Sequence, residues 1–253
     1  LEKGLTTYPK VRGESYLRES IARWLASRFN IQANPDKHIL PVTGTREALF
    51  SVAQALVSGE RGTRVVLPNP FYQIYEGASL LANSSPFYVS ANPKNNYLPD
   101  YEDVPEAVWR KCELLYVCSP GNPTGRTLSL ETYQFLLTKA EHHNFIIAAD
   151  ECYSEVYLDN PPTGLLQAAK SMGSESFKNC LIFHSLSKRS NLPGLRSGFV
   201  AGDSSLIENY RKYRTYHGCA MPIQHQKASA AAWDDEKHVI LNRESYAEKF
   251  SSV

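Results

Sequence analysis

Short apolar runs rich in β-branched residues recur along the chain and alternate with longer stretches that have helical spacing. Runs of this length are typical of strands buried on both faces, as parallel sheets require. The alternation predicts a doubly wound, three-layer α/β/α fold, in which helices cover both faces of a mostly parallel, seven-stranded sheet. The runs are His38 to Val42, Arg64 to Leu67, Pro86 to Val89, Leu114 to Cys118, Phe145 to Ala149, Cys180 to His184 and Gly198 to Ala201.

The pattern changes after Gly202, where strands end and only helical spacing continues. We therefore expect residues 1–215 to form a large domain and residues 216–253 to be a helical continuation toward a small C-terminal domain. The chain opens without a methionine and stops on a polar helical segment, so we expect both ends to be cut. The expected helices are Tyr16 to Phe29, Arg46 to Leu56, Leu130 to His143, Leu206 to Tyr216, Gln224 to Trp233 and Glu236 to Phe250.

The charge balance and the cysteines narrow the functional class. With 27 basic and 26 acidic residues the net charge is +1, so no strong field steers the chain toward nucleic acid or a membrane surface, and we expect a small-molecule partner. No apolar stretch approaches the roughly 20 residues that span a bilayer, and the first residues do not resemble a signal peptide. The five cysteines lack C-x-x-C spacing, which is typical of reduced thiols and favours a cytoplasmic location.

Polar residues that follow the apolar runs are the candidate site residues, because ligands of open parallel sheets bind beyond the carboxyl ends of the strands. After the first run, Gly44 opens a turn into a helix, where free N–H groups and the helix dipole favour a phosphate group. A purely structural turn is the alternative. After the fourth run, a loop rich in proline and glycine presents the Asn122 amide, or forms a plain tight turn.

The fifth and sixth runs are followed by ionisable side chains. Asp150 ends the fifth run, where a buried carboxylate is costly unless a cation pairs with it. A helix cap or a metal ligand is the alternative, but the histidines show no ligand spacing with Asp150, so we expect no metal site. Lys188 would be a surface lysine in isolation. Its context favours function, since Ser185 and Ser187 precede it and a turn containing Arg196 follows.

These motifs together resemble the signature series of the class I/II (fold-type I) aminotransferases, which depend on pyridoxal 5′-phosphate (PLP). Their order and spacing also fit the family, and the resemblance covers nearly the whole chain. It implies that the sheet is the PLP-binding large domain of such an enzyme. The motifs are Asn122-Pro123-Thr124-Gly125, Asp150-Glu151-Cys152-Tyr153, Ser185-Leu186-Ser187-Lys188 and Gly194-Leu195-Arg196-Ser197-Gly198.

The resemblance assigns catalytic roles to four residues. Lys188 is implied to be the Schiff-base lysine and the acid/base that moves the proton between substrate and cofactor. Asp150 is implied to pair with the pyridine nitrogen and keep it protonated, so that the ring can act as an electron sink. Asn122 and Tyr153 are implied to hydrogen-bond the phenolic oxygen of PLP.

Further residues are implied to hold the cofactor. Tyr72 aligns with the aromatic residue that stacks on the ring, with Phe71 as the competing candidate. Tyr8 resembles the tyrosine that reaches the phosphate of the neighbouring subunit, which implies a homodimer with a shared active site; an aromatic packed at a helix entrance is the alternative. The phosphate is expected to bind at Gly44, Thr45, Arg46, Ser185, Ser187 and Arg196.

Three segments, residues 68–75, 183–191 and 213–221, resemble one subgroup, the bacterial succinyldiaminopimelate aminotransferases of lysine biosynthesis. That likeness implies amino transfer between N-succinyl-LL-2,6-diaminopimelate and 2-oxoglutarate. Arg189, Arg214 and His217 are candidate cations for a substrate rich in carboxylates, or else surface or interface residues. The family's N-terminal arm is expected to precede Leu1. The small domain, with the arginine that binds the substrate α-carboxylate, is expected to follow Val253.

Other functions stay open at this stage. A PLP β-lyase, or an aminotransferase for aromatic or branched substrates, would keep every motif. The chain could also be a PLP-binding effector domain of a transcription regulator without turnover, which would need a basic winged-helix segment upstream. A nucleotide-binding protein is disfavoured, because the Gly44 turn lacks the G-x-x-x-x-G-K-[ST] and G-x-G-x-x-G patterns.

Overall fold

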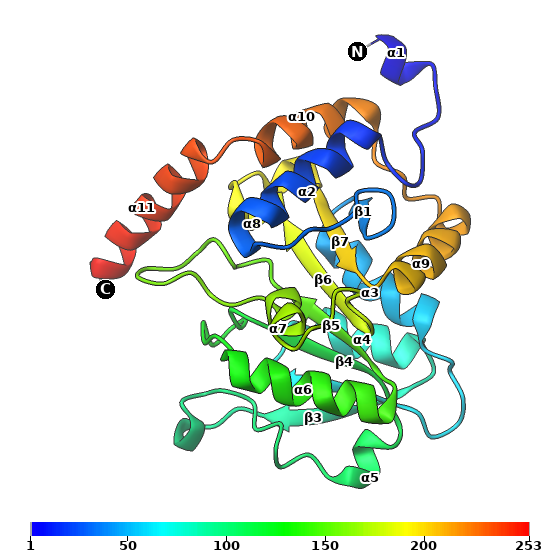
Figure 1. Ribbon diagram of the computed structural model, residues 1–253, viewed down its shortest axis with the longest axis vertical. Coiled ribbons are helices and arrows are strands. Elements are labelled where there is room, and N and C mark those ends of the chain that lie inside the picture. Colours follow the sequence, from blue (N-terminus) through cyan, green and yellow to red (C-terminus); the bar gives the residue numbers. More distant parts are fainter. Residues whose placement is uncertain (1, 253) are drawn as a thin grey trace.

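A seven-stranded sheet forms the centre of the computed structural model, which describes residues 2–252 (Figure 1). The strand order is β1-β7-β6-β5-β4-β2-β3. Strand β7 runs antiparallel to both of its neighbours, and the other four pairings are parallel, so the expected mostly parallel sheet is confirmed. The strands are β1 (Ile39–Val42), β2 (Arg64–Asn69), β3 (Ser85–Ser90), β4 (Cys112–Cys118), β5 (Ile146–Asp150), β6 (Cys180–Ser185) and β7 (Gly198–Gly202).

Each predicted run overlaps a strand. Each predicted helix begins and ends within two residues of the corresponding observed helix. The shorter helices α1, α4, α5, α7 and α8 were not predicted. The helices are α1 (Glu2–Leu5), α2 (Ser15–Phe29), α3 (Thr45–Leu56), α4 (Ile74–Leu81), α5 (Glu106–Trp109), α6 (Leu130–His143), α7 (Leu165–Ser171), α8 (Leu186–Arg189), α9 (Ser204–His217), α10 (Ile223–Trp233) and α11 (Lys237–Ser251), with 3₁₀ turns η1 (Pro93–Asn95) and η2 (Pro193–Leu195).

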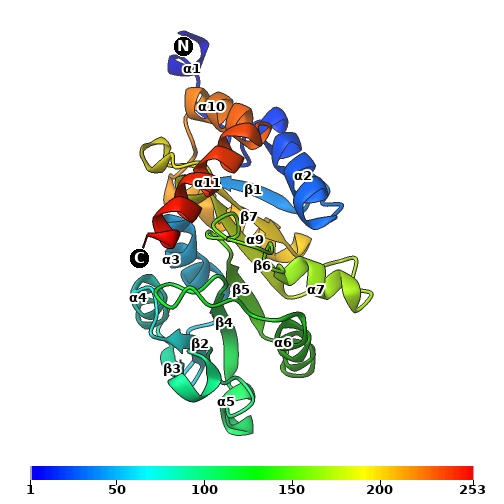
Figure 2. The same ribbon diagram turned by 90° about the vertical axis from the view of Figure 1, so that its left-hand side faces the viewer.

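Helices cover both faces of the sheet and produce two separate apolar cores. Helices α2, α6, α7 and α10 pack on one face, and α3, α4 and α9 pack on the other; Figure 2 shows α2, α6 and α7 opposite α3 and α4. Strand residues alternate between the cores, as the pleat requires. In β4, for example, Leu115 and Val117 join the first core, while Leu114 and Tyr116 join the second. The predicted three-layer α/β/α architecture is therefore confirmed.

Two glycines, one at each end of β7, let this strand approach β6 closely. At Gly198 a Cβ atom would lie 2.5 Å from the carbonyl oxygen of His184, and at Gly202 it would lie 1.9 Å from that of Cys180. Gly202 also has a φ of +148°, which L side chains rarely adopt. The β6–β7 pairing therefore depends on the absence of side chains at both positions, and it places the end of β6 beside the start of β7.

The helical segment after β7 stays attached to the sheet domain over much of its length. The expected boundary between residues 215 and 216 falls inside α9, and α10 packs against α2 with Trp233 buried. Helix α11 leads away from α10, and within it only Val239 is buried (Figure 1). The division into two domains stays a prediction. No helix within residues 2–252 is long and apolar enough to cross a membrane.

Candidate active site

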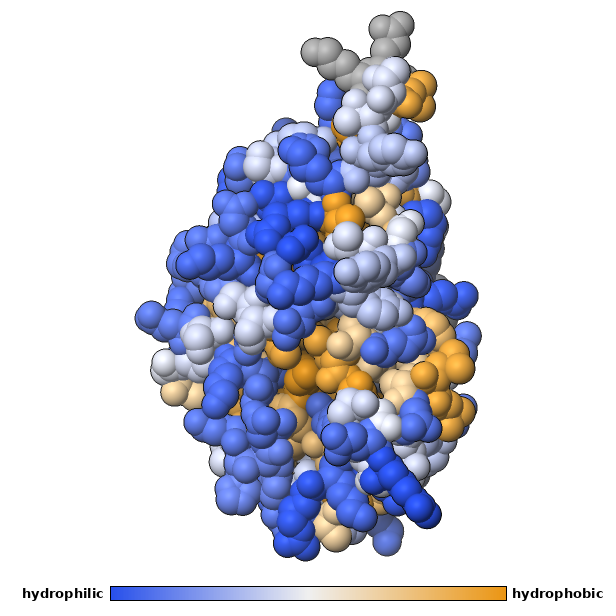
Figure 3. Space-filling model, turned by 90° about the vertical axis from the view of Figure 1, so that its right-hand side faces the viewer, coloured by the Kyte–Doolittle hydropathy of each residue, from blue (hydrophilic) through white to orange (hydrophobic). Residues whose placement is uncertain are grey.

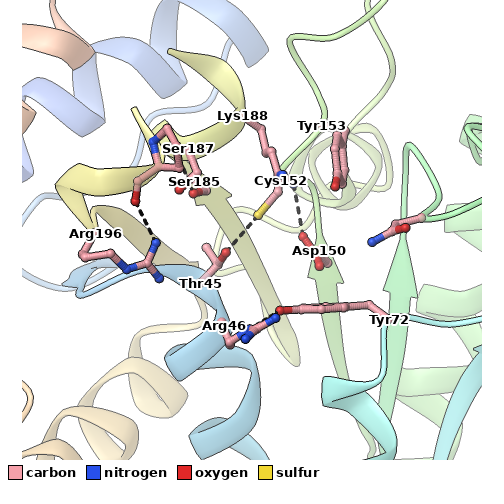
Figure 4. Close-up of a pocket in the computed structure, with 12 residues that line it drawn as sticks. Thr45, Arg46, Tyr72, Asp150, Cys152, Tyr153, Ser185, Ser187, Lys188 and Arg196 are labelled. Carbon is pink, nitrogen blue, oxygen red and sulfur yellow. Dashed lines mark hydrogen bonds between the residues drawn. The ribbon is translucent and has the colours of Figure 1, made fainter. Parts of the chain in front are cut away.

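A cavity of about 570 Å³ lies at the carboxyl ends of β5 and β6, beside the N-terminus of α3 (Figure 4). Ten of the twelve predicted site residues line it, whereas Gly44 lies just behind it and Tyr8 lies elsewhere. Because the strands of one sheet end at the same edge, side chains far apart in sequence meet there. The lining residues are Thr45, Arg46, Tyr72, Asn122, Asp150, Cys152, Tyr153, Ser185, Ser187, Lys188, Pro193 and Arg196.

Lys188 projects into this cavity from α8, a single helical turn that begins where β6 ends. Its Nζ atom lies 5.3 Å from the ring centroid of Tyr153, and it makes no hydrogen bond or ion pair with any residue in the 2–252 range. Burial, followed by the charge of Asp150, raises the pKa of Tyr153 to about 12. The cavity therefore holds an amine with no hydrogen-bond partner among the described residues, next to a phenol that stays protonated at neutral pH.

Asp150 is 4% exposed at the end of β5 and is held by two donors. The Tyr75 hydroxyl donates to Oδ2 at 2.7 Å, and the backbone N–H of Cys152 donates to Oδ1 at 3.2 Å. Within the described part of the chain no cation pairs with this carboxylate. Burial, and then the neighbouring Asp150 charge, raise the pKa of Tyr75 well above its usual value, so this hydroxyl remains a donor. The site fixes the carboxylate in place and leaves room for a cationic ligand.

The opposite end of the cavity gathers hydroxyl and guanidinium donors around the start of α3. Ser185, Ser187 and Thr45 line the cavity together with Arg196, whose Nη1 donates to the carbonyl of Pro193 at 2.9 Å. Arg196 has a φ of +52°, a strained conformation for a residue with a side chain, and such strain is often found at functional sites. Four side-chain donor groups next to a helix N-terminus suit a phosphate dianion.

The turn before α3 is shaped so that this guanidinium can approach the backbone. Gly44 has a φ of +96°, and a Cβ atom there would lie 2.4 Å from Nη2 of Arg196. A side chain at Gly44 would therefore displace the arginine, whatever the strain in the turn itself. This close approach explains why a glycine is required at position 44.

Tyr72 and Arg46 together form one wall of the cavity. The Nε atom of Arg46 donates to the Tyr72 hydroxyl at 2.5 Å, and its guanidinium lies 5.6 Å from the ring centroid. Of the two aromatic candidates, Tyr72 lines the cavity, whereas Phe71 stacks on Tyr88 with 5.6 Å between ring centroids. Figure 4 shows the flat side of the Tyr72 ring below the cavity, a position suited to an aromatic ligand.

Two of the predicted substrate cations are wrong for this structure, because the fold itself uses them. Arg214 is fully buried, and its Nη1 pairs with Glu47 at 2.6 Å. Arg189 is 2% exposed and donates to the Ala232 carbonyl at 2.8 Å. The third candidate, His217, lies 3.5 Å from the same Glu47 carboxylate, and none of the three lines the cavity.

Other residues were missed or stand apart. Sequence reasoning did not select Tyr75, although it lies in the aromatic segment that contains Tyr72. It also missed Cys152, whose Sγ donates to Thr45 Oγ1 at 3.2 Å and whose pKa is raised well above its usual value, chiefly by burial. This thiol is therefore protonated and unreactive. Tyr8 is 97% exposed and does not reach the cavity of its own chain.

Comparison with known proteins identifies the family. Residues 1–252 match the family model described as "Aminotransferase class I and II". The chain belongs to this family. The crystal structure of an aminotransferase from Neisseria meningitidis Z2491 is 48% identical, with a TM-score of 0.95, over 99% of this chain and 64% of that one. The aminotransferase AspB from Helicobacter pylori 26695 is 40% identical, with a TM-score of 0.94, over 99% of this chain and 66% of that one.

Curated relatives are more distant and longer. The LL-diaminopimelate aminotransferase from Dehalococcoides mccartyi strain 195 is 33% identical over 236 residues, which are 92% of this chain and 58% of that protein. The chain thus spans less than two thirds of the length of such relatives. A structure described as a probable N-succinyldiaminopimelate aminotransferase from Thermus thermophilus is 24% identical with a TM-score of 0.84, over 94% of this chain and 61% of that one, which shows a shared fold alone.

Substitution at Gly44 tests whether the close approach of Arg196 to this turn matters for cofactor binding. Gly44→Ala should weaken binding of PLP, the expected cofactor, at least about tenfold, because displacing Arg196 removes a charge-assisted contact worth about 1.5–3 kcal/mol. Gly62→Ala is a matched control, since Gly62 has a similar φ of +93° but no atom within 4 Å of the added methyl group. Titration calorimetry measures both variants. Equal losses of affinity would contradict the assignment of the phosphate end.

Proposed function

We propose that the full-length protein is a PLP-dependent aminotransferase that transfers an amino group from an amino acid to a 2-oxo acid. The observation that carries this proposal is the cavity itself. In one space it combines the exposed amine of Lys188, the buried carboxylate of Asp150 and an anion site around Arg196. Membership of the aminotransferase family supports the same reaction.

The residues present fit PLP in chemistry and in arrangement. Thr45, Ser185, Ser187, Arg46 and Arg196 suit the phosphate, and the Gly44 turn leaves the space that the Arg196 guanidinium needs. Tyr72 offers a flat aromatic wall for the ring, and Asp150 offers an anion for a protonated ring nitrogen. When bound, PLP supplies an electron sink for the negative charge that develops when a proton leaves the substrate Cα.

The side chains of this chain then have separate tasks. Asp150, fixed by the Tyr75 hydroxyl and the Cys152 N–H, keeps the ring nitrogen protonated through its charge. Lys188 would hold the cofactor through its aldehyde, and its amine, when free of that bond, would move the proton at the substrate Cα. Tyr153 stays protonated because its pKa is about 12. Its hydroxyl and the Asn122 amide would donate to the phenolic oxygen of PLP.

For the amino donor we propose N-succinyl-LL-2,6-diaminopimelate, with 2-oxoglutarate as acceptor, in lysine biosynthesis. Support comes from residues 68–75, 183–191 and 213–221, which resemble the succinyldiaminopimelate subgroup. The curated relatives named LL-diaminopimelate aminotransferases support a diaminopimelate skeleton, but their names lack the succinyl group. Free LL-diaminopimelate is therefore the second candidate.

We also propose a homodimer with a shared active site. Tyr8 is 97% exposed outside its own cavity, which suits a role in a neighbouring subunit. Figure 3 shows an apolar area in the middle of a mostly polar face, and such areas often mark partner surfaces. The large-domain assignment of residues 1–215, the continuation in 216–253 and the cytoplasmic location belong to the same proposal.

A donor screen on the full-length protein tests the reaction and its substrate. With 2-oxoglutarate as acceptor, glutamate formation should show a kcat/KM for N-succinyl-LL-2,6-diaminopimelate at least about tenfold above that for LL-diaminopimelate or for aromatic amino acids. A higher kcat/KM for one of the other donors would change the proposed substrate but leave the proposed reaction unchanged. Pyruvate release without a 2-oxo acid would indicate a β-lyase. PLP binding without turnover of any amino acid would contradict the proposal that the protein is an enzyme and would favour a PLP-binding regulator domain.

Paired variants test the division of roles. Asp150→Asn should keep the cofactor but lower kcat at least about 100-fold, since the lost charge acts mainly on the transition state. Arg196→Gln should raise the Kd for PLP at least about tenfold, while kcat at saturating PLP changes little. Equilibrium dialysis and steady-state kinetics measure both. If both variants lost affinity for PLP equally, and Asp150→Asn saturated with PLP had normal turnover, this division of roles between Asp150 and Arg196 would be wrong.

A further inference from the structure

Arg189 follows Lys188 directly in the chain, yet its side chain points into the protein and is 2% exposed. Its Nη1 donates to the carbonyl of Ala232 at 2.8 Å and to Ser190 Oγ at 3.1 Å. Its Nη2 donates to the carbonyls of Trp233 and Asp235, each at 3.4 Å, and pairs with the Glu236 carboxylate. One guanidinium therefore connects the cavity turn α8 with the end of α10 and the residues leading into α11.

The surroundings are specific for an arginine. The guanidinium carbon lies 4.9 Å from the ring centroid of Trp233 and 5.4 Å from that of Trp24, so the group is enclosed by aromatic rings. Carbonyls at the end of a helix lack partners within the helix and carry partial negative charge. A planar fork of five N–H donors reaches several of them from separate nitrogens, whereas an ammonium group carries its three donors on a single nitrogen.

Helix α8 is a single turn, so few hydrogen bonds within the helix hold it. Within the turn, the cap N–H of Ser190 bonds to the carbonyl of Leu186. Helix α11 adds a contact, since the Asn242 amide donates to the Lys188 carbonyl at 3.5 Å. The backbone of Lys188 is therefore held from the α10–α11 side, while its amine projects into the cavity.

A second connection joins α11 to the segment after β5. Glu155, which is buried and lies two residues after Tyr153, pairs with Arg243 of α11 at 2.9 Å. It also pairs with Arg28 of α2 at 2.7 Å. Both chain segments that carry the reactive groups, α8 and the turn after Asp150, thus have ion pairs or hydrogen bonds to α11 or to the residues just before it.

We propose that Arg189 is a positioning residue for Lys188, which clamps α8 to the carbonyl end of α10 and so sets where the Lys188 amine lies relative to Tyr153 and Asp150. The inference rests on the proposed function insofar as Lys188 is the amine that bonds to PLP. It gives Arg189 a role without substrate contact, and it makes the position of the amine depend on the α10–α11 junction.

The test separates covalent bonding from non-covalent binding in the full-length protein. Stopped-flow absorbance measures how fast the apo-protein forms its covalent bond with PLP, and calorimetry measures the affinity for pyridoxamine 5′-phosphate, which has no aldehyde. In Arg189→Met the bond should form at least about tenfold more slowly, because a displacement on the order of 1 Å has effects of this size. The affinity for pyridoxamine 5′-phosphate should stay within about twofold, since the phosphate donors and Asp150 are untouched.

Matched variants keep the result interpretable. Arg189→Lys should recover only part of the rate, because it keeps the charge but loses the fork. Glu236→Gln removes one acceptor at the edge of the clamp and should slow the bond less than Arg189→Met; together with Arg189→Lys it provides the test if Arg189→Met does not fold. Arg23→Gln is the control, because Arg23 contacts Asp234 at the same end of α10 and nothing in α8. It should retain the wild-type rate.

Three outcomes are distinguishable. Slow bonding with unchanged pyridoxamine 5′-phosphate affinity supports the clamp. Wild-type rates in both Arg189→Lys and Glu236→Gln would overturn it. Equal losses of rate and affinity in the Arg189 variants would also overturn it, because the role of Arg189 would then be structural only. Failure of the wild-type protein to bond PLP at all would instead contradict the proposed function.

Discussion

The buried carboxylate of Asp150 is the constraint on which the site depends. It sits at the end of an otherwise apolar strand, where an unpaired charge is costly, and among residues 2–252 no cation pairs with it. Two donors, the Tyr75 hydroxyl and the Cys152 N–H, hold its oxygens. The fold thus maintains a fixed negative charge facing a cavity, and a protonated heterocycle is the kind of ligand that would complete the pairing.

Four arginines that were candidates for binding anions divide into two pairs with different tasks. Arg189 and Arg214 are buried and serve helix ends and the Glu47 carboxylate. Arg46 and Arg196 are exposed in the cavity, where their remaining N–H groups can meet an anion. Because the first pair is used internally, the second pair are the arginines that we propose for binding a phosphate. It also means that a substrate carboxylate needs a cation other than Arg189 or Arg214.

Much of the fold could be predicted because seven apolar runs alternate with helical stretches, a pattern typical of a mostly parallel sheet with helices on both faces. The site followed from the same pattern, since Asp150 and Lys188 stand where strands end. What could not be predicted depends on distant contacts. Strand β7 runs antiparallel to β6 and approaches it closely at Gly198 and Gly202, and the Tyr75–Asp150 bond joins residues 75 positions apart. Arg189 was a candidate cation for substrate carboxylates, but tertiary packing turns its side chain inward.

The most direct test of the account is to identify the lysine that bonds to the cofactor. Full-length protein saturated with PLP is reduced with borohydride, digested and mapped by mass spectrometry. Lys188 is the lysine that lines the cavity with Asp150, so the account predicts one pyridoxyl group, on Lys188, and its loss in Lys188→Ala. A pyridoxyl group on another lysine, or none in the saturated protein, would contradict the central claim.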